Sequence, residues 1–215
     1  MNVPTSADWS AVTPIVIVAI TALIVLLVDL VAHEHAKRYV SILLGVFGSI
    51  AAGVVCAHGY GINYAAFGGS FISGGFSVVF QEIILVGAIG SLVLFGSIGR
   101  EDRIAGAVAL MLWSTCGAML MAGAGSTMTI FLGLELLSLA LYCLCALADR
   151  PTARESALKY LILSSTASGF LLYGMALLFG ASGSVQLGAL VNAATSHTGT
   201  LPQSPSAARN LDSSC

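Results

Sequence analysis

Residues Met128–Leu147 read MTIFLGLELLSLALYCLCAL, an apolar run that carries one acidic residue, Glu135, and no Lys or Arg. At about 1.5 Å per residue, a helix of this length spans roughly 30 Å, the thickness of the hydrocarbon core of a bilayer. A carboxylate at that depth costs about 2 kcal/mol or more. Glu135 is therefore expected to be neutral, to pair with a group on another helix, or to face water.

Two further polar residues share a helix face with this glutamate. Glu135, Ser138 and Tyr142 follow i, i+3, i+7 spacing, which predicts a narrow polar stripe on an otherwise apolar helix. One interpretation is a structural hydrogen bond to a neighbouring helix. The other is a carboxylate that relays protons or ions.

The composition of the whole chain indicates an integral membrane protein. It is 57% hydrophobic and 8% charged, with a mean hydropathy of +0.96. A soluble domain of this size is about a quarter charged. Without a basic stripe or a nucleic-acid motif, no nucleic-acid partner is expected. The predicted fold class is an all-α membrane protein, a polytopic bundle of about six transmembrane helices.

Six apolar segments are long enough to cross a bilayer, and we predict spans at about 14–31, 40–58, 76–98, 104–122, 128–148 and 157–179. Thr13-Pro14 predicts the start of the first helix. The capping-box spacing of Thr152 and Glu155 predicts the start of the sixth, and Gly180 or Gly183 its end. Residues 1–181 would thus form the bundle. Residues 182–215, rich in Ser, Thr, Ala and Pro, would form a polar, disordered tail.

Small residues predict where the helices approach one another closely. Gly45, Ser49 and Gly53 are spaced by four in the second span, and Ser165 and Gly169 in the sixth. Such rows allow close contact between membrane helices.

Basic residues predict the orientation. Seven of the eight lie after the first span, after the third span or around the turn before the sixth: Lys37, Arg38, Arg100, Arg103, Arg150, Arg154 and Lys159. Arg209, in the tail, is the exception. The alternate loops, 59–75 and 123–127, contain no Lys or Arg. By the positive-inside rule the N-terminus is expected outside and the charged loops in the cytoplasm.

Two stretches carry a family resemblance. FLGLELLSLALYCLCAL (131–147) and ESALKYLILSSTASGFLLYGMALLFGASGS (155–184) resemble helices 5 and 6 of subunit N of NADH-quinone oxidoreductase, respiratory complex I. The resemblance implies the N-terminal part of an antiporter-like fold in the bacterial inner membrane. It also implies a translocase subunit that couples electron transfer from NADH to quinone with proton translocation, beside other membrane-arm subunits.

The resemblance also assigns site residues. Glu135 matches the glutamate of the family's proton channel, and Lys159 matches the lysine of an A-L-K-Y pattern. For Lys159 we favour an interfacial lysine paired with Glu155 at i, i+4. Glu82, beside Gln81, either joins a polar path from the outer face, or lies at the membrane interface or makes a structural hydrogen bond.

No cofactor or metal is expected on this chain. Cys143 and Cys145 point to different helix faces, and His33 and His35 have no third ligand nearby. By the resemblance, NADH, FMN, the iron–sulfur clusters and quinone belong to other subunits of the complex.

The family continues beyond this length with lysine-bearing helices, and residues after 181 look unlike it. A fragment, a frameshifted product or a split gene would each explain this. The alternative functions are a subunit of a multi-component cation/proton antiporter, or a non-catalytic membrane scaffold or truncation product.

Overall fold

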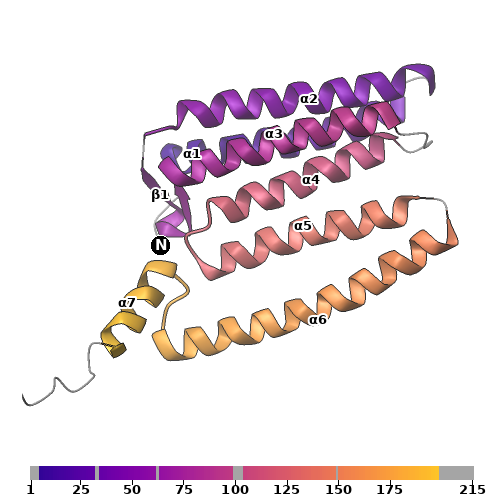
Figure 1. The fold of residues 1–215 in the computed structure, drawn as a ribbon. Helices are drawn as coiled ribbons and strands as arrows, with labels where there is room; N and C mark the ends of the chain where they lie inside the picture. Colours follow the sequence, from indigo (N-terminus) through magenta and orange to yellow (C-terminus); the bar gives the residue numbers. More distant parts are fainter. Residues whose placement is uncertain (1–4, 32–33, 62, 99–103, 149, 199–215) are drawn as a thin grey trace, which may run out of the picture.

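The structure is a computed structural model that describes residues 5–31, 34–61, 63–98, 104–148 and 150–198. Long helices follow one another along the chain, interrupted by one short hairpin (Figure 1). The elements are α1 (Ser6–Val31), α2 (Glu34–His58), β1 (Tyr64–Ala66), η1 (Phe67–Gly69), β2 (Phe71–Ser73), α3 (Gly75–Ile98), α4 (Ile104–Ala122), α5 (Thr127–Leu147), α6 (Pro151–Ser182) and α7 (Leu187–Thr198).

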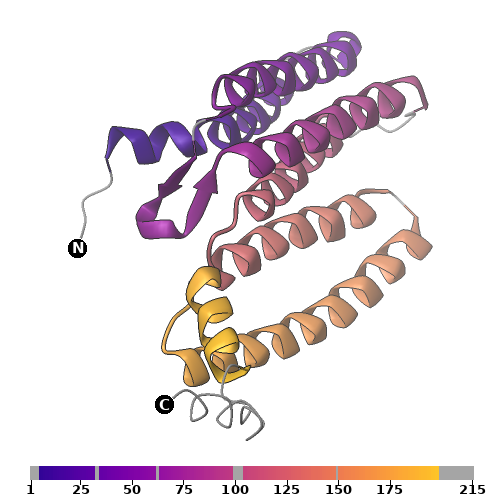
Figure 2. The same ribbon diagram turned by 60° about the vertical axis from the view of Figure 1, so that its left-hand side comes forward.

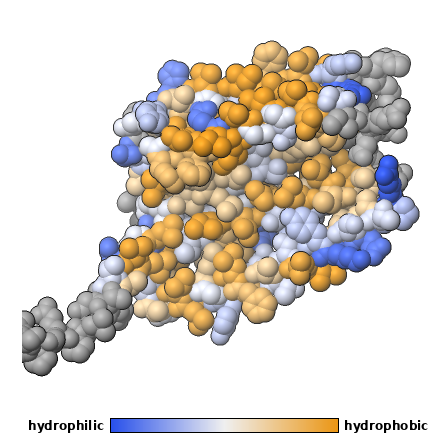
Figure 3. All heavy atoms as spheres, in the orientation of Figure 1, coloured by the Kyte–Doolittle hydropathy of each residue, from blue (hydrophilic) through white to orange (hydrophobic). Residues whose placement is uncertain are grey.

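Six of the described helices, α1 to α6, are long and apolar enough to cross a membrane, which confirms the predicted fold class. We call the end with β1 and β2 the hairpin end. The opposite end, where the α5–α6 turn carries Arg150, is the charged end. Apolar side chains cover the middle of the visible face, whereas hydrophilic ones gather at the start of α6 (Figure 3).

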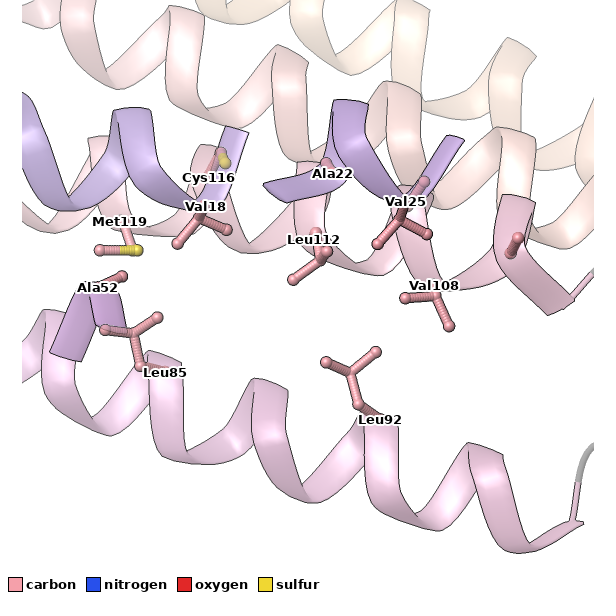
Figure 4. Close-up of a cluster of buried hydrophobic side chains, with 12 residues drawn as sticks. Val18, Ala22, Val25, Ala52, Leu85, Leu92, Val108, Leu112, Cys116 and Met119 are labelled. Carbon is pink, nitrogen blue, oxygen red and sulfur yellow. The ribbon is translucent and has the colours of Figure 1, made fainter. Parts of the chain in front are cut away.

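The core lies between α1, α2, α3 and α4, with α4 at its centre. Side chains from all four helices meet there with almost no exposed surface (Figure 4). The buried set includes Val18, Ala22, Val25, Ala52, Leu85, Leu92, Val108, Leu112, Cys116 and Met119. Helices α5 and α6 are added to one side of this core, α5 on α4 and α6 on α5 (Figure 1).

Glycines set the closest helix contacts. A Cβ atom on Gly45 of α2 would lie 3.2 Å from both Leu92 and Val108, so the predicted small-residue row of α2 does face α3 and α4. A Cβ on Gly117 of α4 would lie 2.5 Å from the backbone nitrogen of Leu137 in α5. Real Cβ atoms do not approach so closely, so this helix crossing requires glycine.

The small residues of α6 were also predicted to form a packing row. Ser165 is exposed, and a Cβ on Gly169 would meet nothing within 4 Å among the described atoms. No described helix packs on these two positions, so the packing row there stays a prediction. Among the described residues of α6 only Ala157, Ser168 and Met175 are buried, because α5 covers one side of this helix.

Helix α1 begins earlier than predicted. It starts at Ser6, and Pro14 lies inside it. The Asp8 carboxylate fixes the first turn by accepting hydrogen bonds from the backbone N–H (2.7 Å) and the hydroxyl (2.8 Å) of Thr5. An N-terminal carboxylate of this kind is half of a capping box. Pro14 removes only one backbone donor, which the rest of a long helix outweighs.

Helix α6 also begins before its predicted capping box. Its first residue is Pro151, which suits the first helical position because a proline has no N–H to leave unpaired. Glu155 pairs with Lys159 instead of capping Thr152. At the other end Gly183, at φ 70°, is the C-cap, and its N–H bonds to the carbonyl of Phe179 at 2.8 Å.

The tail prediction fails over residues 187–198, which form α7. Leu187, Leu190 and Val191 supply an apolar side at helical spacing, and α7 packs against the end of α6 (Figure 2). The sequence prediction was dominated by the Ser, Thr and Pro content of the whole stretch. The part of the predicted tail from 199 onward lies outside the described residues.

Non-helical segments meet at the hairpin end, and we call this meeting the hairpin junction. It joins the β1–β2 hairpin, the α4–α5 turn and the α6–α7 linker, which are far apart in the sequence. Its backbone hydrogen bonds are Ile72 N to Gly123 O (2.7 Å), Gly125 N to Ser70 O (2.9 Å), Thr127 N to Val185 O (2.9 Å) and Leu187 N to Gly125 O (3.0 Å). The hairpin junction therefore ties the starts of α5 and α7 to the hairpin.

Candidate functional site

The candidate site lies between α5 and α6, on the face of α5 that the polar stripe predicted. The hydroxyl of Ser168 on α6 donates a hydrogen bond to Oε1 of Glu135. Ser168 is 8% exposed, and Glu135 itself is partly buried. The glutamate thus has a partner on another helix, as its depth in the membrane requires.

A second cross-helix contact lies toward the charged end. The hydroxyl of Tyr142 donates a hydrogen bond to Oγ of Ser164, and the Tyr142 ring meets the Tyr160 ring edge-on with centroids 4.8 Å apart. Ser138 lies between Glu135 and Tyr142 along α5 and is 7% exposed. We call the polar groups that pair across the two helices, Glu135 with Ser168 and Tyr142 with Ser164, the hydroxyl seam.

The rotation of α5 that creates the seam follows from its sequence. Gly133 packs against Gly117 of α4, where its Cβ would lie 2.8 Å from the Gly117 carbonyl oxygen. Two residues correspond to about 200° around a helix, so Glu135 points away from α4 and toward α6. The start of α5 is fixed by Ser126, whose hydroxyl accepts a hydrogen bond from the Thr129 N–H at 3.2 Å.

Lys159 does not reach Glu135. Its ammonium lies 2.5 Å from Oε1 of Glu155, and the two side chains are 75% and 65% exposed. This is the i, i+4 pair that the spacing predicted. Any part of Lys159 in proton transfer remains a prediction.

Glu82 lies elsewhere in the bundle. It is on α3 beside α2, where Oε2 lies 3.3 Å from the Cβ position of Gly53, whereas Glu135 faces α6. Oε1 of Glu82 is buried and has no hydrogen-bond partner among the described residues. Its neighbour Gln81 is 3% exposed, accepts from the thiol of Cys56 at 3.2 Å, and donates to the Met119 carbonyl at 3.4 Å. The structure therefore does not bring the two glutamates together.

Sequence reasoning missed the α6 half of the seam. Ser164 and Ser168 belong to the run SSTASG, which was interpreted through Ser165 and Gly169 as a packing row. Their i, i+4 spacing matches the polar stripe of α5 and could have identified them. Side-chain volume alone does not separate a serine that packs from one that donates a hydrogen bond.

In the ranges that the structure describes, no three His, Cys, Asp or Glu side chains gather to hold a metal. Cys143 and Cys145 are both exposed. His33, considered with His35 in the sequence, lies outside the described residues.

Comparisons with known proteins match the helices that form this site. The family model described as "NADH:quinone oxidoreductase/Mrp antiporter, TM" matches residues 124–207, which include α5, α6 and α7. Over 204 residues the chain is 37% identical to NADH-quinone oxidoreductase subunit N 1 of Symbiobacterium thermophilum, covering 91% of this chain and 40% of that protein. Subunit N of Granulibacter bethesdensis is 34% identical over 200 residues, covering 91% and 41%. The chain is a homologue of NADH-quinone oxidoreductase subunit N.

Chains of two solved structures share the fold. A chain of respiratory complex I from Thermus thermophilus, solved with bound aureothin, superposes on this subunit N homologue with a TM-score of 0.67 and 31% identity, covering 81% of this chain and 38% of that one. A chain of the membrane-bound sulfane sulfur reductase, an archaeal respiratory complex, gives a TM-score of 0.72 at 20% identity, covering 86% and 40%. The second similarity shows the fold alone.

The homologue spans about 40% of the length of the curated relatives it matches. The family match runs to residue 207, so the expectation that residues after 181 look unlike the family was wrong. Short polar helices such as α7 carry little hydropathy signal, which is why composition concealed the match.

Proposed function

We propose that this chain forms part of a membrane-arm subunit of a proton-translocating NADH-quinone oxidoreductase, with Glu135 as a proton-relay group. The relatives are named as subunits of that enzyme, and a chain of respiratory complex I shares the fold at 31% identity. The observation that carries the proposal is the Glu135–Ser168 contact between two membrane-spanning helices. A translocase needs an ionisable group at such a depth.

The chemistry of this contact suits a relay. A hydroxyl both donates and accepts hydrogen bonds, so Ser168 can donate to the ionised carboxylate and accept from the protonated acid. Glu135 therefore keeps a partner in both protonation states, and neither state leaves a buried polar group unsatisfied. A purely structural contact would need Glu135 to have a partner in only one protonation state.

The finer assignments belong to the same proposal. The membrane is the bacterial inner membrane, with the N-terminus outside and the charged end in the cytoplasm, as the distribution of Lys and Arg favours. The partners are the other membrane-arm subunits. NADH oxidation, quinone reduction and their FMN and iron–sulfur groups reside in other subunits, and this chain contributes to proton movement.

A subunit of a multi-component cation/proton antiporter is the second candidate, because the description of the matched family includes the Mrp antiporter. The relatives named as subunit N favour the oxidoreductase. A non-catalytic scaffold would keep Glu135 for its hydrogen bond alone.

The test replaces Glu135 by Gln in the assembled complex in native membranes. Glutamine keeps the shape and still accepts the Ser168 hydrogen bond, but it cannot carry a proton. We expect the complex to assemble and NADH-driven proton translocation to fall sharply. Glu155→Gln is the matched control, because that carboxylate is 65% exposed and lies outside the seam. Unchanged translocation in Glu135→Gln would reject the relay, and loss of assembly would favour the scaffold.

A further inference from the structure

The hydroxyl seam is asymmetric about Glu135. Toward the charged end, Tyr142 and Ser164 place hydroxyl groups between α5 and α6, and Ser138 is a further buried hydroxyl residue on α5. Toward the hairpin end, the next buried side chain of α6 is Met175, whose thioether neither donates nor accepts a hydrogen bond well. Among the described residues between α5 and α6, a proton on Glu135 therefore has polar neighbours toward the charged end and apolar ones toward the hairpin end.

The Tyr142–Ser164 pair lies between Glu135 and the charged end of the bundle. Tyr142 is 7% exposed, and its ring is held edge-on by Tyr160, so its hydroxyl stays at the seam. Ser164 precedes Ser168 by four residues, about 6 Å along α6. One water making two hydrogen bonds of about 2.8 Å covers that distance.

We propose that Tyr142 and Ser164 form an access gate through which protons pass between Glu135 and the charged end of the bundle. The inference rests on the proposed function and specifies how its relay group is reached. Each hydroxyl accepts a proton on a lone pair and releases its own proton to the next oxygen. O–H bonds alone form and break, and each oxygen returns to its starting charge.

Proton passage through the gate depends on the direction of the hydrogen bond between Tyr142 and Ser164. In the structure Tyr142 donates to Ser164, which points the hydroxyl hydrogen toward α6. Passage of the next proton requires this hydrogen bond to reverse or break, after which it forms again. Tyr142 and Ser164 thus transfer the proton through their own hydroxyl groups, and the pair works as a unit.

The experiment measures NADH-driven proton translocation and its solvent deuterium isotope effect in native membranes containing the assembled complex. Tyr142→Phe keeps the ring against Tyr160 and removes the hydroxyl. We expect translocation to fall about ten-fold, with a larger isotope effect, because the transfer step becomes limiting. Tyr173→Phe is the matched control, since this tyrosine of α6 is 66% exposed and away from the seam.

If the complex that carries Tyr142→Phe fails to assemble, substitutions of Ser164, the hydrogen-bond partner of Tyr142, still test the gate. Ser164→Ala should reproduce the loss and Ser164→Thr, which keeps a hydroxyl, should restore translocation. The double variant Tyr142→Phe/Ser164→Ala should lose no more than either single variant. Wild-type translocation in Ser164→Ala, with loss in Glu135→Gln, would overturn the gate and leave the relay standing. Wild-type translocation in Glu135→Gln would instead overturn the proposed function and the gate with it.

Discussion

Gly117→Ala should destabilise the bundle by opening the contact between α4 and α5. The new Cβ would lie 2.5 Å from the Leu137 nitrogen and 2.7 Å from the Gly133 carbonyl oxygen, both backbone atoms. Ordinary contacts begin near 3.4 Å, so α5 has to move by about 1 Å. A gap of that size forfeits a quarter to a half of the dispersion energy of the atoms it separates. We expect a loss of about 2 kcal/mol.

The assay is thermal unfolding of the purified chain in detergent, followed with a thiol-reactive fluorophore. Cys56 and Cys116 are buried, so their reaction reports unfolding. The background carries Ala at Cys143, Cys145 and Cys215. A loss of 2 kcal/mol corresponds to a decrease in Tm of about 6 °C for a chain of this size.

Gly90→Ala is the matched control, because it makes the same substitution on α3 at a position with nothing within 4 Å. Its Tm should stay at or slightly above that of the parent, since alanine favours helix. An unchanged Tm in Gly117→Ala would refute the close α4–α5 contact, and with it the rotation of α5 that directs Glu135 toward α6.

Three more predictions follow from other parts of the molecule. For orientation, a single cysteine at Ser70 should react with an impermeant reagent in intact cells and one at Ala153 should not; the reverse would place the N-terminus inside. Asp8→Ala should lower Tm by several degrees in the same thiol assay, because the Asp8 carboxylate also accepts from Tyr64 Oη (3.2 Å) and Phe67 N (2.9 Å). In liposomes under a pH gradient, the 215-residue chain alone should leak protons no faster than empty vesicles, because the seam is apolar on one side of Glu135; a saturable flux abolished by Glu135→Gln would contradict this.

Hydropathy sufficed to predict the spans, because a bilayer demands about 20 apolar residues whatever the helices contact. The fourth helix has the predicted bounds, 104–122. The starts of α1 and α6 were missed because they extend beyond the apolar stretch and are fixed by local contacts of Thr5, Asp8 and Pro151. The hairpin was missed as well, since its strands have three residues each and depend on backbone bonds to a distant turn.

The sequence predicted the α5 side of the candidate site but not its α6 side. Glu135 and its stripe follow from helical periodicity within one segment, so the sequence sufficed for α5. Their partners on α6 depend on how far the two helices are rotated and shifted relative to each other. Gly133 sets that rotation through its contact with Gly117, a contact between residues 16 positions apart that no periodicity reports.

The hairpin junction and the α5–α6 turn hold these two helices at both ends of their contact. At the hairpin end the Thr127 N–H bonds to the Val185 carbonyl, and at the charged end α5 stops at Leu147 and α6 begins at Pro151. Along α5, Glu135 lies about 12 Å from Thr127, and Tyr142 lies about 8 Å from Leu147. Two helices joined at both ends can separate only by bowing between those ends. Spin labels at Cys143 and at Leu163, closer to the α5–α6 turn than Glu135 and Ser168 are, should therefore show little change in distance, and any opening of the pair would be centred nearer to Glu135.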